Sequence, residues 1–247
     1  MNVPQPDLGV GAGGDKTKLV DLAAEKAIVE TLLQNGVSFT LVSEESGIQA
    51  YGASPREFYV TVDPIDGTTN FIRGLPFYCT SIAVSAKLSL SSVFAACVTD
   101  LFHDVTYTTV ADKEGAFRDG KEIKPSSTTT LDEAIIGVDL NTYKVKAVAP
   151  KLDKLFHETK HVRHFGANAL ELCYVAEGLT DAFVDIRGKL RTTDVAAGFF
   201  IVKQAGGIVT SPEGGPVDAE LDPRGTVKFV ASGNRRIHER ILSLLKP

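Results

Sequence analysis

Hydrophobic positions recur at helical spacing near the N-terminal end of the chain and at strand spacing after it. Between Lys16 and Gln34, apolar residues stand three or four positions apart and Asn35-Gly36 supplies a stop, so this segment is predicted to be an amphipathic helix. Its apolar stripe comprises Leu19, Leu22, Ala23, Ala27, Ile28, Leu32 and Leu33. Runs rich in β-branched and aromatic residues then predict strands at 38–42, 58–62, 81–86, 92–98 and 105–109. Up to about residue 130 the pattern therefore predicts a sheet with few helices.

Beyond residue 130, short apolar runs alternate with segments of helical periodicity. Strands are predicted at 134–138, 181–186 and 227–231, and helices at 168–177, 193–205 and 237–245. This alternation is typical of helices packed on a sheet. The polar stretch Lys124–Thr130 is the predicted seam. It would divide the chain into an N-terminal α+β half, residues 1–130, and a C-terminal α/β half, residues 131–247.

The composition narrows the class of protein. The chain has 247 residues, of which 43% are apolar, so it can bury the core of one large domain or two modest ones. A net charge of −5 without a basic run argues against nucleic acid as a partner. Cys79, Cys97 and Cys173 form no CxxC pair, which suits reduced thiols. Neither a basic, apolar leader nor a membrane-length apolar run occurs, so we expect a cytoplasmic protein without a membrane partner.

The segment DPIDGTTN at 63–70 carries the most specific chemistry. It follows a predicted strand, and two carboxylates three positions apart at a strand end, Asp63 and Asp66, can converge on a hard cation. Gly67 permits a tight turn, and Thr68 would begin a helix whose free backbone N–H groups favour a phosphate. A turn of solvated acids is the competing interpretation, because Asp, Pro, Gly and Asn are all turn formers.

Two further acidic positions favour the metal site. Glu44 and Glu45 follow the preceding predicted strand, and Asp194 begins a predicted helix. Each position alone is consistent with a surface carboxylate or a helix cap. Three acidic positions that all stand at junctions between elements are harder to explain in that way, so together they indicate a metal-dependent site.

The same motifs resemble those of the inositol monophosphatase superfamily, which includes fructose-1,6-bisphosphatases. SEES at 43–46, DPIDGTTNF at 63–71 and DVAAG at 194–198 match its motifs in order, and the similarity extends from Asp15 to the C-terminus. The pattern is most similar to the archaeal members, which hydrolyse both inositol monophosphate and fructose 1,6-bisphosphate. The resemblance implies a layered αβαβα sandwich, a small sugar or inositol phosphate as substrate, and a homodimer.

The resemblance also implies a cofactor and the roles of the residues around it. Two or three Mg²⁺ ions would be held by Glu44, Asp63, the carbonyl of Ile65, Asp66 and Asp194. Asp21 and Thr68 would orient and activate the attacking water, and Glu45 would place a further water. Gly67 and Thr68 would contact the phosphate. An acidic pocket in a net-negative protein would repel phosphate without cations, so the charges themselves favour a metal-dependent reaction.

A basic segment bears on the substrate. Asp185 matches a family position, usually Glu, that contacts a ring hydroxyl of the substrate. Arg187, Lys189 and Arg191 follow as a compact basic group near the expected pocket mouth. Guanidinium groups suit phosphate oxygens, so Arg187 and Arg191 are candidates for contacts with a second phosphate, and they favour fructose 1,6-bisphosphate as a substrate. A solvated basic turn is an equally open interpretation.

Two other patterns point less clearly to a function. Residues 9–14 satisfy GxGxxG, but Pro4 and Pro6 stand where the strand of a dinucleotide-binding fold belongs. A flexible loop that covers the metal site is the better interpretation. His161 and His164 lack a second pair of zinc ligands and are expected at the surface.

Two alternative functions stay open. A 3'-phosphoadenosine 5'-phosphate phosphatase of the same superfamily would share the metal motifs. A non-catalytic sugar-phosphate-binding protein is the other alternative, although such a protein would have no use for Asp21 and Thr68 as a water-activating pair.

Overall fold

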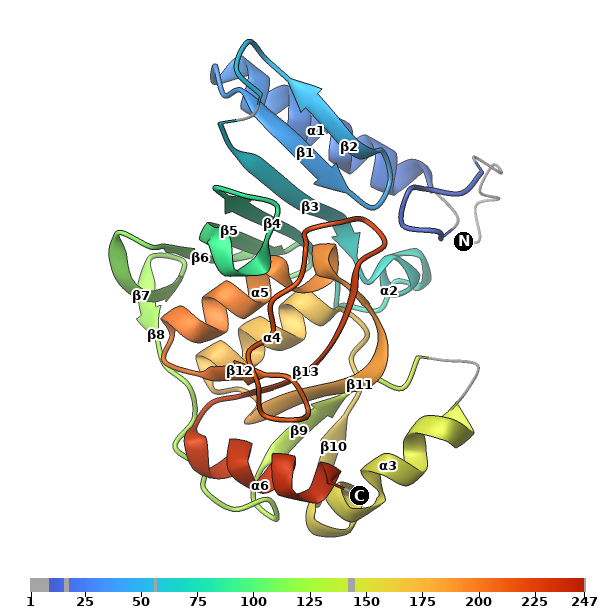
Figure 1. Cartoon of the computed structure of the whole chain (residues 1–247), viewed down its shortest axis with the longest axis vertical. Coiled ribbons are helices and arrows are strands. Elements are labelled where there is room, and N and C mark those ends of the chain that lie inside the picture. Colours follow the sequence, from blue (N-terminus) through green and yellow to red (C-terminus); the bar gives the residue numbers. More distant parts are fainter. Residues whose placement is uncertain (1–8, 16–17, 56, 142–144, 247) are drawn as a thin grey trace.

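Helices and sheets alternate in layers (Figure 1). The computed structural model describes residues 9–15, 18–55, 57–141 and 145–246. From the top of Figure 1 downwards, α1 (Leu19–Gln34) covers the first sheet, and α4 (Asn168–Glu177) and α5 (Thr192–Gln204) lie between the two sheets. The second sheet is covered by α3 (Val145–Glu158) and α6 (Arg235–Leu245). This order is an αβαβα sandwich, so the predicted fold class is confirmed.

The first sheet places two strand ends side by side. Its order is β2-β1-β3-β4-β5-β6-β7-β8. The strands are β1 (Phe39–Ser43), β2 (Gly47–Tyr51), β3 (Tyr59–Asp66), β4 (Cys79–Ser85), β5 (Val93–Asp100), β6 (Val105–Val110), β7 (Lys113–Arg118) and β8 (Lys121–Ile123). β1 and β3 are parallel, with Ser43 beside Val62, whereas the other neighbouring strands are antiparallel. The residues that follow Ser43 and Val62 therefore emerge at the same edge of the sheet.

The second sheet contains the strand β11 (Ala182–Arg191), whose last residue, Arg191, lies beside Glu44, the residue that follows β1. Its order is β10-β9-β11-β13-β12. The strands are β9 (Ile135–Val138), β10 (His161–Arg163), β11 (Ala182–Arg191), β12 (Ile208–Thr210) and β13 (Thr226–Ser232). The pairing of β11 with β13 shifts register between Asp185 and Leu190, where Gly188 has a left-handed φ of +66°. After the shift β11 continues to Arg191, directly before α5.

The central helices carry a core that both sheets share. α5 is buried along nearly its whole length, and its apolar residues belong to one cluster with residues of α4 and of strands from both sheets. A Cβ at Gly198 would lie 2.5 Å from Cδ1 of Leu172, so glycine is what lets α5 approach α4 this closely. The sheets are separated in sequence by the segment between Ile123 and Ile135. A division into halves at residue 130 falls in that segment and stays a prediction.

The first helix is confirmed, but its predicted apolar stripe is only partly the buried face: Ile28 and Leu32 pack against the core, whereas other leucines of the stripe do not. Leu19, Leu22 and Leu33 are exposed by 51%, 37% and 39% of their surface. The buried residues of α1 are Asp21, Glu25 and Val29 instead. Ser43 Oγ at the end of β1 donates a hydrogen bond to the Glu25 carboxylate, so the polar face of the helix is turned toward the ends of the strands. None of the described helices is long and apolar enough to cross a membrane.

Candidate metal and phosphate site

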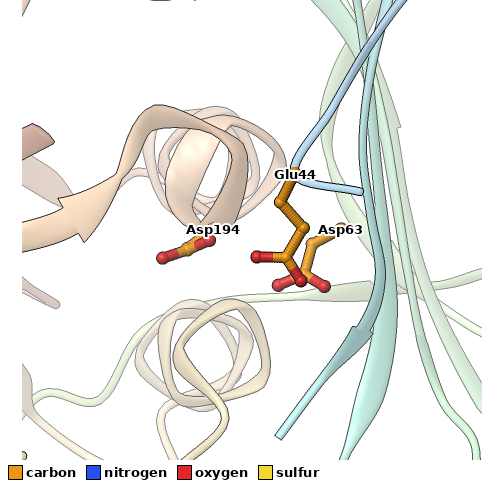
Figure 2. Close-up of side chains that lie close together, drawn as sticks. All are labelled: Glu44, Asp63 and Asp194. Carbon is orange, nitrogen blue, oxygen red and sulfur yellow. The ribbon is translucent and has the colours of Figure 1, made fainter. Parts of the chain in front are cut away.

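Three predicted acids converge where β1 and β3 end and α5 begins. Glu44 follows β1, Asp63 lies near the end of the parallel strand β3, and Asp194 lies in the first turn of α5. Figure 2 shows their carboxylates turned toward one another from these three elements. One oxygen of each lies within 4.8 Å of an oxygen of the others. The spacing therefore allows the three carboxylates to bind one cation together.

Burial makes this convergence costly without a cation. The pKa of Asp63 is raised well above its ordinary value by burial, and the charges of Glu44, Asp66 and Asp194 raise it further. Burial likewise raises the pKa of Glu44 to about 8, partly offset by Arg191. Oδ1 of Asp63 is buried and accepts no hydrogen bond from the described residues. An unpartnered carboxylate oxygen among other oxygen donors fits a hard cation such as Mg²⁺.

Asp66 and Ile65 extend the set of oxygen donors. The pairing of β3 with β4 shifts register between Asp63 and Asp66, and both carboxylates line the same cavity. Oδ2 of Asp66 accepts a hydrogen bond of 2.6 Å from the backbone N–H of Ala169 in the first turn of α4. Burial raises the pKa of Asp66 to about 7. Ile65 also lines the cavity, and its carbonyl accepts a hydrogen bond of 2.9 Å from the Thr68 hydroxyl.

Thr68 connects this donor set to Asp21. It begins α2 (Thr68–Arg73), and its hydroxyl lies 3.4 Å from Oδ1 of Asp21 on α1. Burial, with a contribution from the charge of Glu45, raises the pKa of Asp21 to about 6. The two residues are 47 positions apart in sequence, so the fold brings together the pair that the sequence analysis selected.

Gly67 allows the tight turn into α2. It has a φ of +87°, and a Cβ there would lie 3.0 Å from Cβ of Ala167 and 3.1 Å from the Phe77 carbonyl oxygen. Both the left-handed backbone and the crowding require glycine at this position.

Arg191 lies inside the acidic cluster, not only at its mouth. Its Nη2 forms an ion pair with Oε2 of Glu44, and its Nε lies 3.3 Å from Oδ1 of Asp194. Its Nη1 lies 2.8 Å from Oδ2 of Asp15. The sequence predicted a contact with a second substrate phosphate, which nothing in the structure tests, and gave no sign of these acidic partners.

Asp185 and Arg187 lie behind the wall of the cavity. The Arg187 side chain is only 4% exposed, and its Nη2 lies 2.6 Å from Oδ2 of Asp185 and 2.5 Å from Oδ2 of Asp139. Its Nη1 donates a hydrogen bond of 2.7 Å to the carbonyl of Asn141, which does line the cavity. Neither Asp185 nor Arg187 is among the lining residues, so their direct contact with a substrate stays a prediction.

The cavity around these groups has a volume of about 620 Å³. It is lined by Asp15, Lys18, Asp21, Glu44, Glu45, Asp63, Ile65, Asp66, Gly67, Thr68, Thr69, Asn70, Leu75, Asn141, His164, Phe165, Gly166, Asn168, Arg191 and Asp194. Lys18, Asn141 and Asn168 were not predicted to lie here, because no local motif marks them. His164, expected at the surface, lines the cavity with its Nδ1 3.8 Å from Oδ1 of Asp139.

The glycine-rich segment is anchored to the site. The backbone N–H of Gly13 donates to the Glu44 carbonyl at 2.6 Å, and that of Ala12 donates to the Glu45 carbonyl at 3.0 Å. Nε of Arg224 donates to the Ala12 carbonyl at 2.9 Å. The segment thus covers the edge of the metal site as expected, but backbone hydrogen bonds hold it there. Pro4 and Pro6, the basis for rejecting a dinucleotide loop, lie outside the described residues.

Comparisons with known proteins agree on one family. A family model described as "Inositol monophosphatase family" matches residues 9–247. The fructose-1,6-bisphosphatase/inositol-1-monophosphatase of Methanothermobacter thermautotrophicus is 38% identical over 246 residues, which cover 96% of this chain and 86% of that protein. The bifunctional NADP phosphatase/NAD kinase of Methanococcus maripaludis is 31% identical over 251 residues, covering 95% of this chain but only 44% of that protein.

A solved structure shows the same fold. The crystal structure of the MJ0109 gene product, an inositol monophosphatase-fructose 1,6 bisphosphatase, superimposes with a TM-score of 0.84 at 29% sequence identity. The match covers 97% of this chain and 89% of that one.

Proposed function

The chain belongs to the inositol monophosphatase family, several of whose named relatives are phosphatases, and we propose that it is a Mg²⁺-dependent phosphatase acting on inositol monophosphate and fructose 1,6-bisphosphate. The observation that carries this proposal is a single cavity lined by both the converging acids, Glu44, Asp63 and Asp194, and the pair Asp21 and Thr68. A phosphate ester that enters this cavity meets the metal donors and the candidate proton acceptor together.

The donor set favours Mg²⁺ as the cofactor. Two or three ions would be held by Glu44, Asp63, the Ile65 carbonyl, Asp66 and Asp194. These groups offer only oxygen atoms, which Mg²⁺ and Mn²⁺ prefer, whereas zinc sites rely on His and Cys. Bound there, the cations supply charge neutralisation for the phosphate and lower the pKa of water.

Asp21 and Thr68 would move the proton of the attacking water. If the Thr68 hydroxyl turns from the Ile65 carbonyl, it can pass its single proton to Oδ1 of Asp21, 3.4 Å away, while its oxygen accepts a proton from the water. A pKa of about 6 suits Asp21 for this role, because the carboxylate is then mostly ionised near neutral pH yet still basic enough to accept a proton. Glu45 lines the same cavity and would orient a further water.

The chemistry of the cavity also supports the proposed substrates. Lys18 and Arg191 line it, so cationic groups are available for a phosphate beyond the one that is cleaved. The relative from M. thermautotrophicus is named for both activities. A nucleotide substrate is a second candidate, because the chain is also similar to a bifunctional NADP phosphatase/NAD kinase.

We further propose that the active form is a homodimer. Four large apolar side chains, from α2 and the residues after it and from the turn after β5, are exposed by 37% to 54% of their surface: Phe71, Leu75, Leu101 and Phe102. Leu75 also lines the cavity. Edge-to-face ring contacts link Phe71 and Phe102 through Tyr78. A contiguous apolar patch of this kind is what a second copy of the chain would cover.

Phosphate release with Mg²⁺ from four substrates in parallel tests the proposed activity. The substrates are inositol 1-phosphate, fructose 1,6-bisphosphate, NADP and 3'-phosphoadenosine 5'-phosphate. We expect turnover of the first two, and about a hundredfold or greater loss of turnover in Asp194→Asn, which removes a metal ligand but keeps its shape. If none of the four is hydrolysed, the proposal is wrong.

A further inference from the structure

The acidic cluster already contains a positive charge from the chain itself. Arg191 contacts two of the three converging acids, Glu44 and Asp194, and its side chain is 18% exposed. Asp63 is not among the ion-pair partners of Arg191, and its Oδ1 lacks a hydrogen-bond partner in the described residues. The guanidinium therefore pairs directly with Glu44 and Asp194, whereas its charge acts on Asp63 only from beyond ion-pair distance.

The backbone of Arg191 is fixed by the start of α5, while the far end of its side chain reaches an exposed carboxylate. Arg191 ends β11 and caps α5, and its backbone N–H donates to Oδ2 of Asp194 at 3.0 Å. On the other side, its Nη1 contacts Asp15, whose carboxylate is 85% exposed. The guanidinium can therefore leave Glu44 and turn toward solvent without breaking the helix cap.

We propose that Arg191 is an internal counter-ion that competes with the metal ion for Glu44 and Asp194. Carboxylate oxygens that face the guanidinium are not available to a second cation, and two positive charges a few ångströms apart repel strongly in a buried site. Binding of the metal ion therefore requires Arg191 to withdraw. This inference rests on the proposed function only in taking these acids to be metal ligands.

A displaced Arg191 would couple metal binding to substrate binding. It lines the same cavity as Thr68 and Asn168, so the freed guanidinium stays within the space that a phosphate ester occupies. A phosphate group gives the forked donor a replacement for the carboxylates that it loses. By linkage, phosphate should then tighten metal binding, and metal should tighten phosphate binding to the same extent.

The competition is tested by metal binding without substrate. Isothermal titration of the metal-free protein with Mn²⁺ compares wild type with Arg191→Gln, alongside thermal unfolding in EDTA. We expect Arg191→Gln to bind Mn²⁺ about five- to a hundredfold more tightly and to unfold at a lower temperature in EDTA. Unchanged or weaker Mn²⁺ binding in this variant would refute the proposal.

Arg224→Gln is the matched control. Arg224 contacts the glycine-rich segment, because its Nε donates to the Ala12 carbonyl. Arg191 likewise contacts Asp15, directly after that segment. In the described residues, none of the hydrogen bonds of Arg224 reaches the acidic cluster. Its loss should leave Mn²⁺ affinity near the wild-type value. If Arg224→Gln tightens binding as much as Arg191→Gln does, release of the glycine-rich segment explains the effect and the counter-ion proposal is wrong.

Two further measurements keep the proposal testable if Arg191→Gln does not fold without metal. In wild type, the ¹⁵N resonance of Arg191 Nε, assigned by its loss in Arg191→Lys, should shift as Mg²⁺ saturates the site, and an unmoved resonance contradicts displacement.

In the wild-type protein, inorganic phosphate should tighten Mn²⁺ binding more than it does in Arg191→Lys, because lysine lacks the forked donor. Equal tightening refutes the coupling. These readouts are equilibrium values, so they hold even if no ester is hydrolysed.

Discussion

Asp63 shows how a single residue can weaken the fold for the benefit of the site. It is buried beside three other carboxylates, and its Oδ1 has no hydrogen-bond partner in the described part of the chain. Its pKa is raised by burial first, then by Glu44, Asp66 and Asp194. The metal-free protein therefore bears the cost of an acid in an unfavourable place, and a bound cation would remove that cost.

Asp63→Asn should separate stability from function. The amide has the same shape but no charge, and it can donate to the neighbouring carboxylates, so we expect the metal-free protein to become more stable by about 1–2 kcal/mol. Metal-dependent phosphatase activity should fall about a hundredfold or more if Asp63 is a metal ligand, as we propose. Urea unfolding in EDTA, with and without Mg²⁺, measures both states. A variant that is less stable than wild type in EDTA would show that Asp63 is not strained.

Glu171 is a buried acid outside the proposed ligand set, although the charge of Asp66 is one of the smaller causes that raise its pKa. Its carboxylate accepts hydrogen bonds from the backbone N–H groups of Phe165 and Gly166, and burial raises its pKa to about 8. The ordinary pKa is 4.5, so the folded protein holds this proton more tightly than the unfolded chain. The stabilisation from Glu171 is thus complete below about pH 4.5 and is lost as the pH rises toward 8.

Glu171→Gln should therefore flatten part of the pH profile of stability. The amide oxygen can accept the same two N–H groups and cannot ionise. Between pH 5 and 8, the free energy of unfolding of wild type should fall relative to the variant, by at most about 1.4 kcal/mol per pH unit. Parallel profiles from urea unfolding in EDTA would mean that Glu171 does not titrate in this range.

At the scale of elements, two parallel strands and one helix start assemble the site. Pairing Ser43 with Val62 puts Glu44 beside Asp63, and α5 adds Asp194 from the far half of the sequence. A helix of only six residues, α2, fixes Thr68, and glycines with left-handed φ stand at both of its ends: Gly67 at +87° and Gly74 at +72°. An added Cβ would be crowded at Gly67 but not at Gly74, so the same substitution at both positions separates the effect of crowding from that of the backbone conformation.

Gly67→Ala should damage both the fold and the site, whereas Gly74→Ala should damage neither severely. At Gly74 no atom lies within 4 Å of an added Cβ, so the cost is the left-handed backbone, about 1 kcal/mol. At Gly67 the added Cβ also meets the Phe77 and Gly166 carbonyls, at 3.1 and 3.2 Å, so we expect a loss of about 2–4 kcal/mol and displacement of Thr68. Urea unfolding and phosphate release compare the pair. Equal losses would show that crowding at Gly67 is unimportant.

Local patterns were enough for most elements and failed where tertiary contacts decide. The helix at 168–177 has the predicted bounds, since its apolar residues and Gly178 mark it locally. Helix α3 was not predicted, because Pro150 interrupts its pattern. The short strands β7 and β8 were not predicted either, because they are rich in charged residues. In α1 the buried face carries Asp21 and Glu25, which no rule of amphipathicity selects.

The three converging acids were predictable because motifs carry them, whereas the residues that support the site were not; that the acids bind metal stays a prediction. Glu44, Asp63 and Asp194 each follow a recognisable junction between elements, so a resemblance to one family was enough to select them. The contacts of Arg187 with Asp139 and Asp185 join β11 to residues that follow β9, and no sequence motif records such a long-range pairing.

At the scale of the whole molecule, the site ties the sandwich together. Glu44 and Asp63 come from the first sheet, while Arg191 ends a strand of the second sheet and leads into α5 between them. A cation held by Glu44, Asp63 and Asp194 would therefore link the first sheet to the central layer. The exposed apolar patch formed by Phe71, Leu75, Leu101 and Phe102 is where we propose that a second copy packs.

Phe102→Glu should dissociate the proposed dimer. Phe102 is 54% exposed and contacts Tyr78 edge to face. A carboxylate at this position would bury a charge in the proposed interface, and the free-energy cost of that burial should dissociate the dimer. Light scattering at several protein concentrations should give a dimer mass for wild type and a monomer mass for the variant. Val110→Glu is the control, since Val110 is similarly exposed, at 45%, but ends β6 and makes none of the ring contacts of the patch. A monomeric wild type, or dissociation by both variants alike, contradicts a dimer built on this face.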